Sequence, residues 1–335
     1  MTHIHVDILE VLKLFENEKN NREKLLANIL SVRSELYRNI LFQNSEKFLP
    51  EVGPDGTIYL IPGNQSLYLY RGQVQDYPTC LPRIYRDNPT DTDLFAAILK
   101  QIEFKIVLKD HPAVEAILND GVHISFTGLA QHYGLATNYL DLTSDPYVAA
   151  FFAVCEYCES EQRYLPAAEQ DKPGVLMKTP SIIYLNPLNI LKFRPIGLQP
   201  FPRPGSQKAY AVSLEKGESL PAHKILFWQS TEASQYIYDL FQKGELLFPP
   251  DPIKRKAEEI ADAVIFSQQS IDEISSRCSF PQQPNFYLEQ LDFEISDICN
   301  FEFTSDELNQ FKEDWDKFGK HAFYNQIGPP RIQYI

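Results

Sequence analysis

The stretch from Phe126 to Ala153 reads Phe126-Thr-Gly-Leu-Ala-Gln-His-Tyr-Gly-Leu-Ala-Thr-Asn-Tyr-Leu-Asp-Leu-Thr-Ser-Asp-Pro-Tyr-Val-Ala-Ala-Phe-Phe-Ala153. Amide, imidazole, carboxylate and hydroxyl side chains are concentrated here between two apolar flanks. Asp145-Pro146 ahead of an apolar run predicts the start of a helix, with Ser144 or Asp145 as its N-cap. Because helix N-termini also attract anionic and polar ligands, the stretch is either turn-and-cap chemistry or part of a site.

Composition limits the classes of protein that this chain can represent. Its 335 residues are 44% hydrophobic, enough for a sizeable core and about two domains. It contains no apolar run of membrane-spanning length, no signal-peptide pattern and an odd number of cysteines, five, so we expect a cytoplasmic protein. The net charge of −14 disfavours generic binding to nucleic acid.

The cysteines give little indication of a metal site. Cys155 and Cys158 form a C-x-x-C pair, but the pair follows an apolar run and no second pair occurs. Two buried thiols on a core helix are therefore favoured over a zinc or redox site, and no metal is expected.

Apolar periodicity predicts an α+β protein. The central domain, residues 51–264, is expected to consist of short strands flanked by helices, between a helical region at 1–50 and an extension at 265–335 that is loop-rich until a final helix. The proline-rich segment 195–204 is expected to be irregular. The predicted helices lie within 5–47, 91–118, 231–242, 253–263 and 305–318, and the predicted strands at 57–61, 67–70, 174–177, 182–185, 210–214 and 225–228.

Two further polar patches accompany the quoted stretch. In Leu69-Tyr-Arg-Gly-Gln73, an arginine at the end of a strand suits the binding of phosphate or carboxylate, or an ordinary surface ion pair. In Arg203-Pro-Gly-Ser-Gln-Lys-Ala-Tyr210, Gln207 comes just before a strand and faces either the core or a cleft. His132 is either a satisfied core histidine or a donor in a pocket. No nucleophile elbow or paired-glycine phosphate loop occurs.

Together the three patches resemble the FRG domain, a bacterial and phage family named for a Phe/Tyr-Arg-Gly motif. Tyr70-Arg71-Gly72-Gln73 matches that motif, and Gln131-His-Tyr-Gly-Leu-Ala-Thr137 with Leu140-Asp141 resembles the central signature. Arg203 with Gln207 and Phe248-Pro-Pro-Asp251 resemble later elements, so the resemblance covers about residues 57–263. This chain departs from the family pattern in carrying Asn138, Leu142 and Ala209 in place of arginine, tryptophan and glycine.

The order of the motifs is also similar to that of mono-ADP-ribosyltransferases. Those enzymes have an arginine on a first strand, a Ser-Thr-Ser strand followed by Val-Ala and Phe-Ala, and a strand bearing Glu-x-Glu. The resemblance implies that the strands of the central domain form a small split or mixed sheet, as in ADP-ribosyltransferases, and that NAD is the substrate. It implies that Arg71 binds the diphosphate, that Thr143 or Ser144 orients the nicotinamide ribose, and that Tyr133 or Tyr139 stacks on nicotinamide.

The third motif departs most from the transferases, because Gln207 stands where they have glutamate and supplies no negative charge. Asp141 or Glu232 could then supply the negative charge in place of the missing glutamate. The residues that we predict as catalytic are Arg71, His132, Asp141, Ser144 and Gln207. The residues predicted to bind the nucleotide are Tyr70, Gly72, Gln73, Gln131, Tyr133, Gly134, Thr137, Asn138 and Thr143.

The resemblance thus implies an NAD-dependent transferase that modifies a protein or nucleic acid, as a toxin or in defence against phage. A non-catalytic module that senses a nucleotide or a partner is the alternative. A hydrolase or nuclease with His132 as base and Asp141 as its orienting group comes third.

Overall fold

A computed structural model describes residues 4–18, 47–52, 56–63, 68–167, 172–180 and 193–329. The predicted N-terminal helical region is helical over residues 8–18. The remainder of that region, 19–46, and the strand predicted at 182–185 lie outside the described residues.

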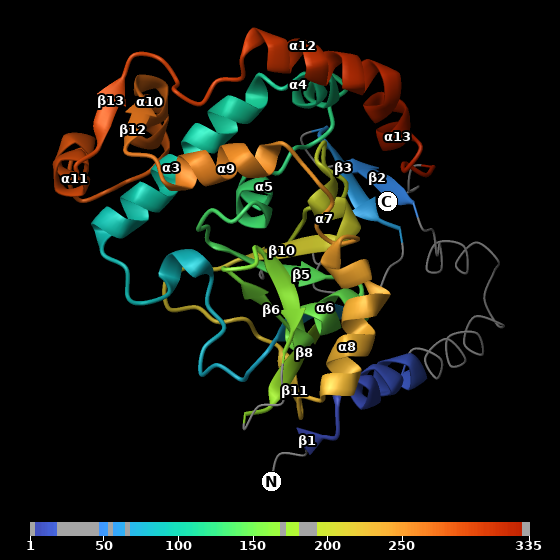
Figure 1. Ribbon diagram of the computed structural model, residues 1–335. Helices are drawn as coiled ribbons and strands as arrows, with labels where there is room; N and C mark the ends of the chain where they lie inside the picture. The colour runs from blue at the N-terminus through green and yellow to red at the C-terminus, as the bar shows by residue number, and fades with distance from the viewer. Residues whose placement is uncertain are drawn as a thin grey trace.

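A mixed seven-stranded sheet forms the centre of the molecule, which confirms the α+β prediction (Figure 1). Only β1 and β11 pair in parallel, and the other neighbours are antiparallel. Across the sheet the strands are β1 (Ile4–His5), β11 (His223–Phe227), β8 (Gly174–Pro180), β4 (Tyr68–Gln73), β5 (Tyr139–Thr143), β10 (Ala209–Ser213) and β9 (Phe193–Pro195).

The sheet divides between β4 and β5. β4 pairs with β8 along its whole length, and β5 pairs with β10 along its whole length. Between β4 and β5, however, only Tyr70 and Thr143 are paired. Residues 71–73 and 139–142 therefore border a split in the sheet, and both carry predicted site residues.

Helices cover one face of the sheet. α6 (Pro146–Val154), α8 (Thr231–Leu240) and the N-terminal helix pack there in one hydrophobic cluster with Tyr70. Gly72 lies so close to α6 that an added Cβ would come within 1.9 Å of the Ala149 carbonyl oxygen. Because side chains alternate along a strand, Tyr70 and Gly72 face these helices, and Arg71 and Gln73 leave β4 on the opposite side.

The opposite face carries its own cluster and is covered by irregular segments. Leu69, Leu142 and Met177 pack there against Cys80 and Leu220, which come from the segments at 74–90 and 214–222. The first of these segments contains the short 3₁₀ helix η1 (Arg83–Tyr85).

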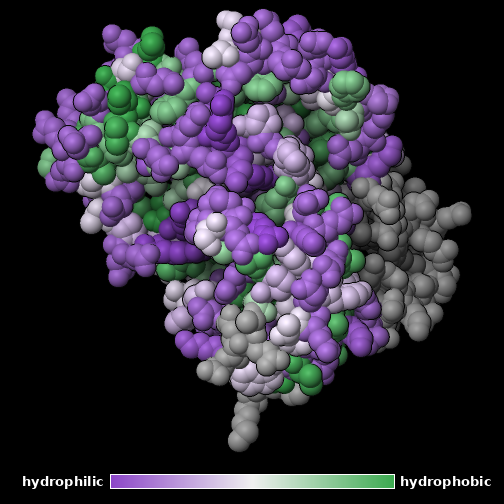
Figure 2. All heavy atoms as spheres, viewed as in Figure 1, coloured by the Kyte–Doolittle hydropathy of each residue, from purple (hydrophilic) through white to green (hydrophobic). Residues whose placement is uncertain are grey.

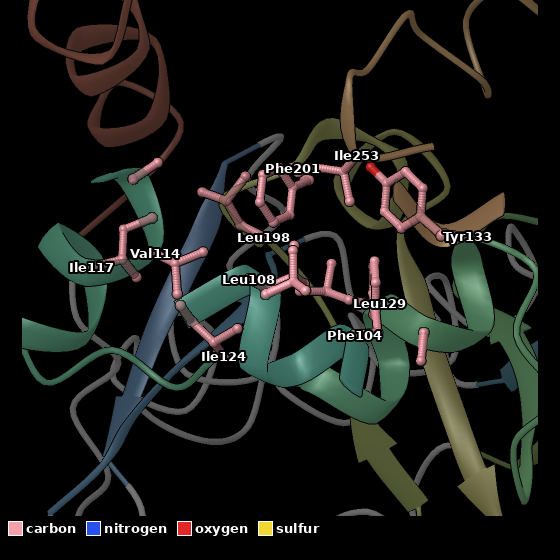
Figure 3. Packing of buried hydrophobic residues seen from close by; sticks show 14 of the residues in the cluster. Phe104, Leu108, Val114, Ile117, Ile124, Leu129, Tyr133, Leu198, Phe201 and Ile253 are labelled. Carbon is pink, nitrogen blue, oxygen red and sulfur yellow. The ribbon is translucent and has the colours of Figure 1, made fainter. Parts of the chain in front are cut away.

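A largely helical layer lies above the sheet in Figure 1 and has a hydrophobic core of its own. Figure 3 shows Phe104, Leu129, Phe201 and Ile253 packed together in this core. Trp315 and Phe323, near the C-terminal end of the chain, belong to the same cluster. The elements are α3 (Asp91–Lys109), α4 (Pro112–Asn119), α5 (Phe126–His132), α7 (Pro202–Ser206), α9 (Ile253–Ala261), α12 (Ser305–Asp314), the π-helix η4 (Trp315–Gly319), α13 (Lys320–Tyr324) and the ribbon of β2 (Phe48–Val52) and β3 (Ile58–Pro62). The short helix η3 (Gln242–Gly244) instead lies beside α8 and Phe151 of α6.

The expectation that residues beyond 265 are loop-rich is wrong. They form β12 (Ile265–Ser267), α10 (Gln268–Arg277), α11 (Pro284–Leu291) and β13 (Glu294–Ser296), with β12 and β13 paired in parallel. Apolar positions are sparse in this segment, and those that are buried pack on α3. A group of hydrophobic residues is nevertheless visible at the surface of this region in Figure 2.

Two local expectations are also corrected. The proline-rich segment contains α7, in which Pro202 supplies the preset backbone angle of a first helical turn. Cys155 and Cys158 lie on β6 (Cys155–Cys158), which pairs with β7 (Arg163–Pro166), and not on a core helix. Cys155 is buried and Cys158 is only half-buried.

None of the described helices is long and apolar enough to cross a membrane.

His111 should make the stability of the protein depend on pH. It caps α4, its ring stacks on Phe311, and burial lowers its pKa to about 4. Since an unfolded histidine titrates near pH 6.5, the unfolded state binds the extra proton first, and stability falls as the pH drops from about 6.5 towards 4. We expect His111→Asn, which retains a capping oxygen, to remove about 2 kcal/mol of the stability difference between pH 7 and pH 5. Urea unfolding at both pH values measures this, and an equal fall in both proteins would contradict it.

Candidate functional site

Arg71 lies at the split of the sheet. Its Nη1 donates to the backbone carbonyl of Asp141 across the split at 2.9 Å, while its Nε is buried without a partner. A guanidinium has five N–H donors, so most of its hydrogen-bonding capacity is left for a ligand.

Asp141 faces the helical side of the split, and neighbouring side chains fix its orientation. Its Oδ2 accepts from Gln131 Nε2 at 3.0 Å, and the Gln131 oxygen in turn accepts from Thr137 Oγ1 at 2.6 Å. The Thr137 hydroxyl also accepts from the Tyr139 backbone N–H. The other carboxylate oxygen, Oδ1, is buried without a partner. The carboxylate is therefore held at one oxygen and available at the other.

His132 ends α5 beside Asp141. Burial is the main reason that its pKa is lowered, and the positive charge of Arg203 acts in the same direction, whereas Asp141 and the Gln207 amide oppose the shift. The ring is therefore neutral at neutral pH, and its Nε2 is buried without a partner. Asp141, Arg203 and Gln207 therefore lie near the ring.

Arg203 is a site residue that the sequence-based site prediction missed. It is only 8% exposed, and its guanidinium carbon lies 4.5 Å from the centre of the Tyr133 ring. Its Nη1 donates to the His132 carbonyl at 3.3 Å, and its Nε has no partner. The one sequence signal was its match, with Gln207, to a family element.

Tyr133 and Phe248 flank this arginine, whose guanidinium carbon lies 5.9 Å from the centre of the Phe248 ring. The Tyr133 hydroxyl donates to the Asp251 carboxylate, and burial is the main cause that raises the pKa of both groups. Tyr164 stacks on Phe248 with ring centres 4.7 Å apart, and burial, followed by the charge of Asp141, raises its pKa to about 12. No sequence motif pointed to Tyr164.

The third patch meets the quoted stretch where β10 begins. Thr143 Oγ1 donates to the Gln207 backbone carbonyl at 2.8 Å, and Gln207 Nε2 donates to the Leu247 carbonyl at 3.0 Å. Asp145, and not Ser144, caps α6 by accepting from the Tyr147 N–H. The Ser144 hydroxyl is thus not used as a cap and is buried without a partner.

Several residues predicted to bind the nucleotide instead have structural contacts. Tyr70 packs on Phe15 with ring centres 5.2 Å apart, and Gly72 allows the close approach of α6. Gly134 has a positive φ of 94° and its carbonyl accepts from Arg83, and Asn138 Nδ2 donates to Ser213 Oγ at 2.9 Å. Gln73 faces away from α6, and its Oε1 is buried without a partner.

Motif residues in and around the split thus carry polar atoms that lack partners. A buried polar group without a hydrogen bond costs about 1–3 kcal/mol, so such groups are few in folded proteins and mark ligand or water sites when they cluster. Six such side-chain atoms belong to the motif residues. They are Arg71 Nε, Gln73 Oε1, His132 Nε2, Asp141 Oδ1, Ser144 Oγ and Arg203 Nε.

The described arginines fall into two groups by their partners, and Arg83, Arg86 and Arg194 resemble the two motif arginines in donating only to backbone carbonyls. Arg163, Arg255 and Arg277 each pair with a glutamate. Among the described residues, Arg71 and Arg203 form no ion pair and donate only to backbone carbonyls. Guanidinium groups that lack a carboxylate partner are suited to bind an anionic ligand.

A separate cavity of about 880 Å³ lies between the β2–β3 ribbon, α7 and the C-terminal helices. Phe48, Ser206 and Trp315 are among the residues that line it. None of the predicted site residues does so, and this cavity is not the candidate site.

Residues 66–162 match the family model described as FRG domain. The chain contains an FRG domain. The matched interval includes Arg71, His132 and Asp141, while Arg203 and Gln207 reach the site from outside it. No curated protein and no solved structure matches the chain.

Proposed function

We propose that this FRG-domain protein binds NAD at the split between β4 and β5 and transfers its ADP-ribose to a macromolecular target. The observation that carries the proposal is the set of unpartnered buried polar atoms on motif residues of β4, α5, β5 and α7, which lie at and around the split. Two arginines without carboxylate partners suit a diphosphate, and a half-engaged carboxylate suits the ribose beside it.

The arrangement of the strands supports the likeness to mono-ADP-ribosyltransferases. The motifs follow one another on β4, on β5 and at the start of β10, and these three strands are neighbours in the sheet. Tyr70, Thr143 and Ala209 lie in one row across them. The three motifs thus meet at the site although more than sixty residues separate each from the next in the chain.

The proposed chemistry breaks the bond between the nicotinamide nitrogen and ribose C1′. The bonding electron pair leaves with nicotinamide, which becomes neutral, and positive charge develops on C1′ and the ring oxygen. A nucleophile of the acceptor then bonds to C1′ and releases its proton. A fixed negative charge close to the ribose stabilises such a transition state.

In this proposal Asp141 supplies the charge that Gln207 lacks. Gln131 holds the Asp141 carboxylate by one oxygen, which leaves Oδ1 for a ribose hydroxyl. Gln207 gives its amide N–H to Leu247, and its side chain also hydrogen-bonds to His132, so it would act on the ligand through the imidazole. Glu232, the other acid considered, is exposed at the start of α8. Transfer to a cellular macromolecule would suit a toxin or a protein of phage defence.

The amide at position 207 favours a second candidate, a non-catalytic module that binds the nucleotide without cleaving it. Gln207 is 7% exposed and its side chain is tied to a neighbouring carbonyl, as expected of a residue that shapes a site. In that case the split would hold NAD, or a similar nucleotide, as a signal.

Removal of the Arg71 guanidinium tests the binding role. We expect Arg71→Ala to weaken NAD binding about 10- to 100-fold, because a charge-assisted contact of about 1.5–3 kcal/mol is lost. Calorimetric titration with NAD and an assay for released nicotinamide measure binding and cleavage. Arg277→Ala, which removes a surface arginine paired with Glu273, is the matched control.

The outcomes separate the candidate functions. Binding and nicotinamide release that both require Arg71 support the transferase. Binding without release supports the sensing module. Neither binding nor release, together with phosphodiesterase activity that requires His132, would instead favour a hydrolase.

A further inference from the structure

The cavity of about 880 Å³ lies against a different face of α7 from the candidate site. Arg203, on α7, donates to the His132 carbonyl at the site. Pro202, Gly205 and Ser206 lie on another face of this helix and line the cavity. Pockets that bind small molecules have volumes of roughly 300–1,000 Å³. The volume of this cavity therefore fits one small molecule.

Aromatic side chains form much of the cavity wall. They come from β2, the start of α4 and the C-terminal helices, and they are Phe48, His111, Phe311, Trp315, Phe318 and Phe323. Phe48, Trp315 and Phe323 are at most 8% exposed and belong to the core, so the core holds each of them in place. Phe318, in contrast, is 71% exposed. Aromatic rings that are fixed in the wall of a cavity suit a flat aromatic ligand, because such groups pack edge to face or in offset stacks.

Part of the wall is an unusual helical segment. η4 is a π-helix between α12 and α13, and its residues Trp315, Phe318 and Gly319 all line the cavity. π-helical turns are rare, and they occur frequently at functional sites. Gly319 is also unfavourable in a helix relative to alanine. A Cβ at this position would lie 2.8 Å from Cε3 of Trp315, so the glycine makes room for the indole ring at the cavity.

The cavity offers little to a charged ligand. Among the described residues, the ionisable side chains that line it are His111, Lys208 and Asp314. The Lys208 ammonium pairs with Asp145 at 2.7 Å, and Asp314 is exposed to solvent. Burial lowers the pKa of His111 to about 4, so the ring is neutral at neutral pH. Its Nδ1 accepts from the Ala113 N–H, so the ring hydrogen is on Nε2, which can donate to a ligand.

We propose that this cavity is a second binding site, which holds an uncharged aromatic small molecule against Trp315 and Phe318. His111 donates a hydrogen bond to the ligand from Nε2. The inference does not depend on the proposed function, because none of the residues assigned to the candidate site lines the cavity. The ligand nevertheless lies against α7, the helix that carries Arg203.

The two tryptophans of the chain allow a direct test. Trp228→Phe removes the tryptophan that follows β11 and leaves Trp315 as the only indole in the protein. The probe is N-phenylnaphthylamine, an uncharged aromatic molecule that accepts excitation energy from tryptophan. We expect it to bind with a Kd of about 10–100 µM and to reduce the emission of Trp315 in a saturable manner. Its sulfonated analogue, anilinonaphthalene sulfonate, is the matched anionic probe and should bind about tenfold or more weakly, because no free cation lies among the described lining residues to offset burial of its charge.

Two substitutions that fill the cavity show where the probe binds. Ala322→Phe adds a ring to the wall near the C-terminal end of the chain, and Gly205→Leu adds a side chain beside Phe48 on α7. Each should weaken binding of the uncharged probe about tenfold or more, because the added atoms occupy its place. Ser276→Phe, on the exposed surface of α10, is the matched control and should leave the affinity unchanged. Thermal unfolding of each variant shows whether the fold is retained, which is expected for Ala322→Phe because Ala322 is exposed.

An unchanged affinity for the uncharged probe in a folded cavity-filling variant would overturn the inference. The same conclusion would follow if the probe left the emission of Trp315 unaltered. Equal or tighter binding of the sulfonate would contradict the assignment of an uncharged ligand.

Discussion

Replacement of Asp141 by asparagine is expected to reduce the rate of nicotinamide release about 100-fold. The substitution keeps the size of the side chain and an oxygen that can accept from Gln131, but it removes the negative charge next to the developing positive charge on the ribose. NAD affinity should change by no more than a few-fold, because the guanidinium of Arg71 binds the backbone carbonyl of residue 141 and not its carboxylate. Steady-state release assays and calorimetry together separate the two effects.

Asp145→Asn is the matched control for this prediction. Asp145 is a nearby carboxylate that caps α6 and pairs with Lys208 at 2.7 Å, outside the split. The Asp145→Asn variant should lose some stability but little of its nicotinamide-release activity. Release that is unchanged in Asp141→Asn would exclude the carboxylate from the chemistry. An equal loss in both variants would show a general effect of charge and not a role of Asp141.

Gly72→Ala is expected to destabilise the protein by about 3 kcal/mol or more. The added Cβ would lie 1.9 Å from the Ala149 carbonyl oxygen and 2.7 Å from the Ala153 nitrogen. Both are backbone atoms of α6, so relief requires that the helix move away from β4. The glycine of the Tyr-Arg-Gly motif is thus explained by packing, and the arginine beside it by the site.

Urea unfolding measures the effect of Gly72→Ala, with Gly205→Ala as its control. The nearest atom to a Cβ at Gly205 is Leu198 Cδ1 at 3.5 Å, an ordinary contact, and alanine favours the helix in which Gly205 lies. The control should be neutral or slightly stabilised. Equal stability of Gly72→Ala and the wild type would contradict the packing explanation.

Much of the fold follows from local patterns in the sequence. The strands at the Tyr-Arg-Gly motif and after Lys208, the helix after Asp145, and the helices after Ser230 and Thr304 depend on alternation, capping and proline placement. These signals lie within a few residues of one another. The region after residue 265 was misjudged because its few apolar side chains acquire meaning only when they pack on α3.

The site was harder to predict because its contacts join distant residues. Sequence motifs brought Arg71, His132, Asp141 and Gln207 together as candidates, and contacts and charge effects now link them in space. The pattern did not reveal that Arg203 stacks on Tyr133 or that Tyr70 and Arg71 face opposite sides of the sheet. Such relations depend on how strands far apart in the chain are aligned.

The order of strands in the sheet has a practical consequence for expression of the matched interval by itself. The excised segment 66–162 would contain β4 and β5 but neither β8 nor β10, with which they form nearly all of their ladders. Its two central strands would expose bare backbone edges, and such edges promote self-association. We expect that peptide to aggregate, and biochemical work on the FRG domain will require at least the chain through Asp251, which also supplies Arg203, Gln207 and the acceptor for Tyr133.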